Sequence, residues 1–89
     1  MMVAVNTTEL IGLLDSVGVP SDSYSIGADR DESYCLLLEH GRWKVYYSER
    51  GNRNEEASYA SEEAACRRLF DWLMGDHIVR DRMRERGAK

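Results

Sequence analysis

The sequence predicts a small α+β domain in which two helices pack on one face of an antiparallel sheet of three or four strands. The stretch 33–48 alternates apolar and polar side chains as a β-hairpin does. Amphipathic stretches at 7–17 and 61–75 stand on either side of it. A sheet with one apolar face needs a cover, which such helices supply. The expected order is α-β-β-β-β-α, or α-β-β-β-α without a short strand at Tyr24.

The register of the hairpin follows if His40 and Gly41 form a two-residue turn. Three apolar cross-strand pairs then share the face toward the helices, namely Leu38–Trp43, Leu36–Val45 and Tyr34–Tyr47. The opposite face carries the pairs Leu37–Lys44, Cys35–Tyr46 and Ser33–Ser48. A slip of one residue would turn the apolar set toward water, so the register should be well specified.

The helix before the hairpin is expected from Thr7 to Val17, where leucines recur at helical spacing. Asn6 is the first candidate for its N-cap, with Thr7 and Thr8 as rivals. Gly18 suits the left-handed position just after the helix, and a proline two residues later prevents its continuation.

The helix after the hairpin is expected to begin behind an N-cap at Ser61, with two glutamates in its first turn. Its inward stripe consists of Ala65, Leu69, Trp72 and Leu73. Gly75 and Asp76 interrupt this pattern. Residues 1–75 are therefore expected to form a single domain, and 76–89 a charged helical extension or a frayed tail.

Two further strands are expected beside the hairpin. Tyr24 and Ile26 alternate with a serine and suggest a short strand, followed by a polar turn at 28–32. After the hairpin, we expect a polar loop over Arg50–Asn54 and then a strand over Glu55–Ala60.

Composition excludes several classes of protein. The chain has 89 residues and a net charge of −4, which argues against binding to a nucleic-acid backbone. Double-stranded-RNA-binding domains share the α-β-β-β-α order, but two glutamates open the helix where such a domain needs lysines. No apolar run approaches the length of a membrane span. With no secretory signal pattern, Cys35 and Cys66 are expected to be reduced thiols of a cytoplasmic protein.

No arrangement of residues predicts a reaction, a metal or a cofactor. The cysteines and the histidines His40 and His77 lack the spacing of a metal site. No nucleophile stands in a recognisable motif beside a base and a third group. Paired carboxylates fall in expected turns and at a helix start, where solvation and capping explain them. We therefore expect a protein that is not an enzyme.

The hairpin face away from the helices is the expected partner-binding surface. Tyr46 should point outward there, and tyrosine buries a large area at small entropic cost. The residues assigned to this surface are Leu37, Lys44, Tyr46, Ser48, Glu49 and Arg50. The alternative is self-association of two copies through the same face.

Four segments resemble a group of small bacterial proteins of the immunity type, encoded beside secreted polymorphic toxins. These are Tyr24–Gly27, Ser33–Leu36, Trp43–Gly51 and Ser61–Cys66, within a likeness over about Tyr24–Leu73. The resemblance implies a small cytoplasmic α+β protein that binds and blocks a toxin, and it carries no catalytic residues. The arginine-rich end after Gly75 lies outside the pattern.

Overall fold

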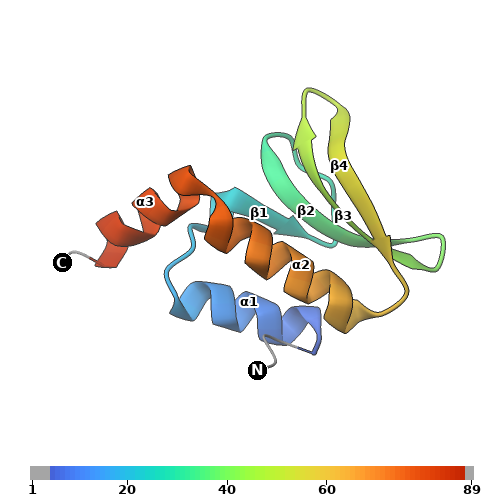
Figure 1. The fold of residues 1–89 in the computed structure, drawn as a ribbon, viewed down its shortest axis with the longest axis horizontal. Helices are drawn as coiled ribbons and strands as arrows, with labels where there is room; N and C mark the ends of the chain where they lie inside the picture. The colour runs from blue at the N-terminus through green and yellow to red at the C-terminus, as the bar shows by residue number, and fades with distance from the viewer. Residues whose placement is uncertain (1–4, 88–89) are drawn as a thin grey trace.

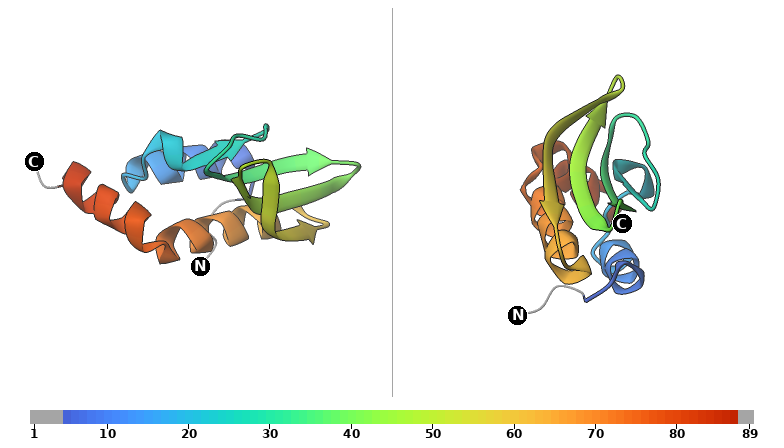
Figure 2. Two further views of the ribbon diagram at one scale, coloured as in Figure 1. Left: turned by 90° about the horizontal axis from the view of Figure 1, so that it is seen from above. Right: turned by 90° about the vertical axis from the view of Figure 1, so that its right-hand side faces the viewer.

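A computed structural model describes residues 5–87 as a small α+β domain with three helices and a four-stranded sheet (Figure 1). The elements are α1 (Thr7–Ser16), a 3₁₀ turn (Ser21–Ser23), β1 (Tyr24–Ile26), β2 (Ser33–Glu39), β3 (Arg42–Glu49), β4 (Asn52–Tyr59), α2 (Glu62–Gly75) and α3 (His77–Gly87). Figure 2 shows α1 and α2 side by side, with α3 extending away from strands β2 to β4.

One main core joins α1 and α2 to the sheet. Leu10 and Leu14 of α1, Leu69 of α2, Leu36 of β2 and Val45 of β3 are all fully buried in it. These are positions that helical and strand periodicity had assigned to the interior. Their burial confirms that α1 and α2 cover the same face of the hairpin.

The sheet is mixed, so the prediction of an antiparallel sheet is wrong for its first strand. The strands lie in the order β1-β2-β3-β4, and β1 pairs with β2 in parallel. Parallel neighbours usually need a crossover of a dozen residues or more. Here the segment 27–32 suffices because β1 has only three residues, so the chain returns over a short distance.

The register of the β2–β3 hairpin is confirmed at every pair, from Ser33 opposite Ser48 to Glu39 opposite Arg42. His40 and Gly41 both have positive φ, 53° and 77°, as a type I′ turn requires. Leu38 nevertheless remains 57% exposed. The tip of the hairpin lies beyond the helices, so Leu38 has little to pack against, whereas its partner Trp43 packs against the main core (Figure 1).

A second tight hairpin replaces the expected loop at Arg50–Asn54. Arg50 and Gly51 have φ values of 52° and 81°, so they repeat the geometry of the first turn. β4 therefore begins at Asn52 and places Tyr59 opposite Trp43. The prediction underestimated arginine before glycine as a turn pair, because asparagine and aspartate are the usual residues there.

A bulge interrupts β4 opposite Tyr46. Val45 pairs with Ala57, but Tyr47 pairs with Asn54, which leaves one extra residue on β4. Glu55 takes up the bulge with a φ of 54°. Bulges twist a strand and re-aim its side chains, and they also protect the outer edge of a sheet from pairing.

The helix termini follow the expected capping rules. Asn6 Oδ1 accepts a hydrogen bond of 2.8 Å from the Glu9 backbone N–H, and Ser61 Oγ accepts one of 3.1 Å from Ala64. α1 ends at Ser16, one residue earlier than predicted. Val19 N–H then donates to the Leu14 carbonyl at 2.9 Å, which completes a Schellman motif with Gly18 in the left-handed region.

The charged segment after Gly75 forms a separate helix, α3. Asp76 caps it, since its Oδ1 accepts a hydrogen bond of 3.0 Å from the Val79 backbone N–H. Val79 is 5% exposed and belongs to the main core. An ion pair of 2.9 Å between Arg82 and Asp22 joins α3 to the 3₁₀ turn before β1.

The first turn offers a test of its strained backbone. A non-glycine residue in the left-handed region costs about 1–2 kcal/mol, and asparagine tolerates it best. His40→Asn should therefore raise the free energy of unfolding by about 0.5–1 kcal/mol in urea titrations. Gly41→Ala should lower it by about 1–2 kcal/mol through strain, since no atom lies within 4 Å of the added Cβ. If His40→Asn and Gly41→Ala changed the free energy of unfolding by the same amount and in the same direction, the left-handed conformation of this turn would be contradicted.

Candidate functional site

The expected partner-binding face is covered, and this corrects the predicted exposure of its central residues. Tyr46 is fully buried, and Ser48 and Leu37 are 1% and 8% exposed. Together with Cys35, Tyr46 and Leu37 form a second small core on this face. Of the residues assigned there, only Lys44, Glu49 and Arg50 reach solvent to a useful extent.

The segment 27–32 provides the cover. Asp29 accepts hydrogen bonds from the Tyr46 hydroxyl at 2.6 Å and the Ser48 hydroxyl at 3.3 Å. Asp31 accepts one of 2.6 Å from the Arg50 backbone N–H. In the right-hand view of Figure 2, this segment lies on the side of β3 away from α2.

Arg53 of β4 completes this second core. Its guanidinium stands 4.4 Å from the centre of the Tyr46 ring and forms ion pairs with Glu39 at 2.8 Å and Glu56 at 3.0 Å. Burial and the bond to Asp29 raise the pKa of Tyr46 above its usual range. The face is thus a sealed structural layer rather than an open sheet.

A different part of the sheet is open and concave. Three aromatic side chains, Tyr34, Tyr47 and Trp72, meet where α2 ends over β2 and β3. The Tyr34 ring centre lies 4.9 Å from that of Tyr47 and 4.9 Å from that of Trp72. We call the adjoining hollow of about 380 Å³ the aromatic pocket, lined by Tyr34, Tyr47, Asn54, Glu55, Trp72 and Asp76.

Carboxylates give the aromatic pocket a negative character. Asp76 accepts a hydrogen bond of 2.5 Å from the Tyr34 hydroxyl while it caps α3. Burial opposes its ionisation, but these hydrogen bonds prevail and hold the pKa of Asp76 below its usual value. Glu55 is exposed at the bulge and forms no ion pair with any residue in the described part of the chain. Asp76 therefore presents negative charge at neutral pH, and Glu55 adds a second carboxylate to the aromatic pocket.

This arrangement suits the recognition of a cation. Aromatic faces attract ammonium and guanidinium groups, and neighbouring carboxylates add charge-assisted hydrogen bonds. The chain itself contains an example, because the Arg68 guanidinium lies 4.4 Å from the centre of the Trp72 ring. A lysine or arginine of another protein would meet the same chemistry in the aromatic pocket.

Sequence reasoning assigned these aromatic residues to the interior and Asp76 to a break in the helix. The structure leaves Tyr34, Tyr47 and Trp72 only partly buried. A signal was present, since tyrosine and tryptophan at the end of an apolar stripe often keep one polar edge in water. That Asp76 would join them depended on how the end of α2 packs against β2, a contact between residues distant in the chain.

Comparisons with family models, curated proteins and solved structures find no match. The resemblance to immunity-type proteins therefore rests on the sequence segments alone. Among the side chains that the structure describes, those of residues 5–84, no three acidic, cysteine or histidine groups converge as metal ligands. None of the helices within residues 5–87 is long and apolar enough to cross a membrane.

Proposed function

We propose that this chain is a non-enzymatic protein-binding domain whose aromatic pocket receives a basic side chain of its partner. The observation that supports this is the junction of three aromatic rings with the carboxylates of Asp76 and Glu55 in one hollow. Asp76 is held in its charged form by hydrogen bonds, so the pocket is organised before a partner arrives. Preorganisation reduces the entropic cost of binding.

The partner we propose is a bacterial toxin, which the chain would inhibit in the manner of an immunity protein. The resemblance of Trp43–Gly51 and the other three segments to that group favours this class of partner. A net charge of −4 favours fast association with a basic protein surface. Lys44, Glu49 and Arg50 remain accessible and would lie in the rim of a larger interface.

Other predicted roles have less support. Self-association was expected through the face that segment 27–32 now covers, so it would need another surface. Binding to duplex RNA stays a prediction that the acidic character of the aromatic pocket disfavours.

The proposal predicts a binding defect in Glu55→Lys. The substitution should weaken the complex with the proposed toxin about tenfold or more, because it places a cation against the incoming basic group. Titration calorimetry with the purified toxin domain measures the affinity, and a toxicity assay reports neutralisation. Asp15→Lys provides the matched control, since Asp15 is exposed and does not line the aromatic pocket.

Two results would count against this function. If no complex forms with an adjacent toxin at micromolar concentrations, the partner class is wrong. If a complex forms but Glu55→Lys and Asp15→Lys bind equally well, the toxin uses another surface. Thermal denaturation of both variants should show that each is folded.

A further inference from the structure

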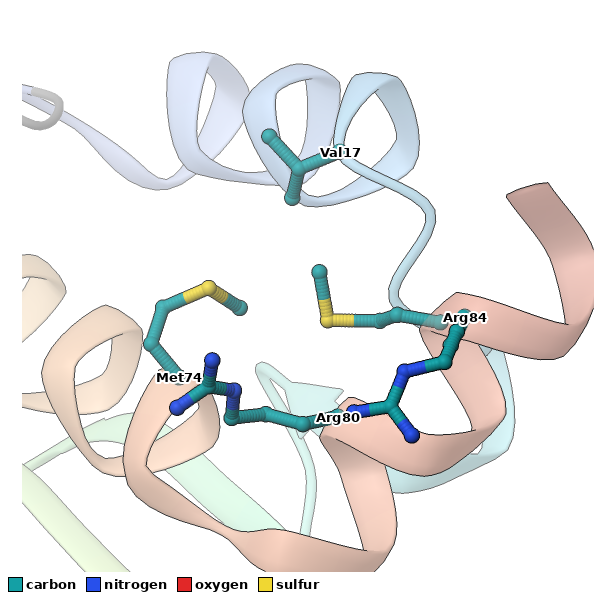
Figure 3. Close-up of a pocket in the computed structure, with 5 residues that line it drawn as sticks. Val17, Met74, Arg80 and Arg84 are labelled. Atoms are coloured by element: carbon teal, nitrogen blue, oxygen red, sulfur yellow. The ribbon is translucent and has the colours of Figure 1, made fainter. Parts of the chain in front are cut away.

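A second hollow lies between α1 and α3, and it shares no residue with the aromatic pocket. It is an open groove of about 480 Å³ lined by Val17, Met74, Arg80, Met83 and Arg84. Figure 3 shows Val17 projecting from α1 toward Met74, with Arg80 and Arg84 along the α3 side. We call it the methionine groove.

The walls of the methionine groove are apolar and adaptable. Val17 is 37% exposed although it sits at the end of a helix whose leucines are buried. Met74 and Met83 are partly buried and flank the main core. Methionine side chains are flexible and polarisable, and they are common on surfaces that accept apolar side chains of partners.

The rim of the methionine groove is positively charged, in contrast to the net charge of the chain. Arg80 is exposed and forms no ion pair within residues 5–84. Arg84 forms a single ion pair with the side chains of residues 5–84, at 3.3 Å to Asp81 on its own helix. Residues four apart stand on one face of a helix, with Cβ atoms about 5–6 Å apart. Two guanidiniums thus point along the same side of an apolar hollow.

We propose that the methionine groove binds an acidic amphipathic helix of a protein partner. Apolar side chains of that helix would pack on Met74, Met83 and Val17. Its carboxylates, spaced three or four residues apart, would pair with Arg80 and Arg84, whose own spacing matches this interval. Because the groove is open, it leaves a small molecule largely in water, whereas an elongated helix can cover it.

A designed peptide tests this site directly. The probe is a synthetic peptide of about 15 residues, long enough for helix formation, with leucines and glutamates on one face. Methyl NMR of the full chain should show shifts of the Met74 and Met83 signals on titration. The Leu37 methyl signals report the buried far face and should stay in place. A peptide with lysine at each glutamate position should not bind.

Charge reversal separates the guanidiniums from the apolar walls. Arg80→Glu should weaken peptide binding about five- to tenfold, and added salt should weaken binding to the unmodified chain. Arg67→Glu is the matched control, because Arg67 is exposed on α2, lacks an ion pair within residues 5–84 and does not line the groove.

Three outcomes would overturn the proposal. If the glutamate and lysine peptides bound equally well, the groove would bind apolar side chains without selecting for negative charge. Shifts of Met74 and Met83 that depend on protein concentration alone would make a second copy the occupant. The absence of any shift at millimolar peptide would mean that the groove binds no such helix. None of these results bears on the aromatic pocket, so the toxin-binding experiment remains independent.

Discussion

Tyr46→Ala is expected to lower the free energy of unfolding by about 3–5 kcal/mol, the cost of removing a buried aromatic ring. Tyr46 is fully buried in the second core, where it contacts segment 27–32 through Asp29 and lies against Arg53. Such a loss is a large part of the total stability of a domain of this size. Urea titration followed by circular dichroism measures it.

Conservative variants distinguish the ring from the hydroxyl. Tyr46→Phe keeps the ring and removes the bond to Asp29, so it should cost only about 1 kcal/mol. Asp29→Ala leaves the Tyr46 hydroxyl without its acceptor and should cost about 1–3 kcal/mol. If Tyr46→Ala lowers the free energy of unfolding by less than about 1 kcal/mol, the Tyr46 side chain is exposed in solution. Segment 27–32 then does not cover this face of the sheet.

Asp76→Ala is expected to lower the free energy of unfolding by about 2–4 kcal/mol. The substitution removes the N-cap of α3 and leaves the Tyr34 hydroxyl without its hydrogen-bond acceptor. The Asp76 carboxylate accepts from the Val79 backbone N–H at the start of α3 and from the Tyr34 hydroxyl in the sheet. Asp76→Asn retains a good capping group and should cost much less. Similar losses for both variants would show that charge, rather than capping, dominates at this position.

The dependence on pH follows from the same carboxylate. The pKa of Asp76 is lower in the folded chain than the value near 3.9 of an unfolded one, so its ionisation stabilises the fold at neutral pH. This contribution disappears as the pH falls through the folded-state pKa. Below about pH 4, the melting temperature should therefore fall more steeply for the unmodified chain than for Asp76→Asn. If the melting temperatures of the two chains fell in parallel as the pH was lowered, the lowered pKa of Asp76 would be contradicted.

Prediction from sequence succeeded where interactions are short in range. The turn at His40 and Gly41 determines the register of β2 and β3, and alternation then selects Leu36 and Val45 for the core. The caps of α1 and α2 depend on residues within three or four positions of one another. The missed hairpin at Arg50–Gly51 is also local, and a weaker residue preference concealed it.

The accessible surfaces depended on contacts between residues distant in the chain. Alternation placed Tyr46 on the face away from the helices, but only the path of segment 27–32 decided that Asp29 would cover it. Likewise, the packing of α2 on β2 brings Asp76, the residue after α2, to Tyr34, forty-two positions away, and forms the aromatic pocket. By itself, the sequence determined which residues alternate, turn and cap, because these preferences act between near neighbours. Tertiary packing decided which side chains stay in water. A short segment such as 27–32 can cover a face of the sheet, and the sequence of that face does not predict the cover.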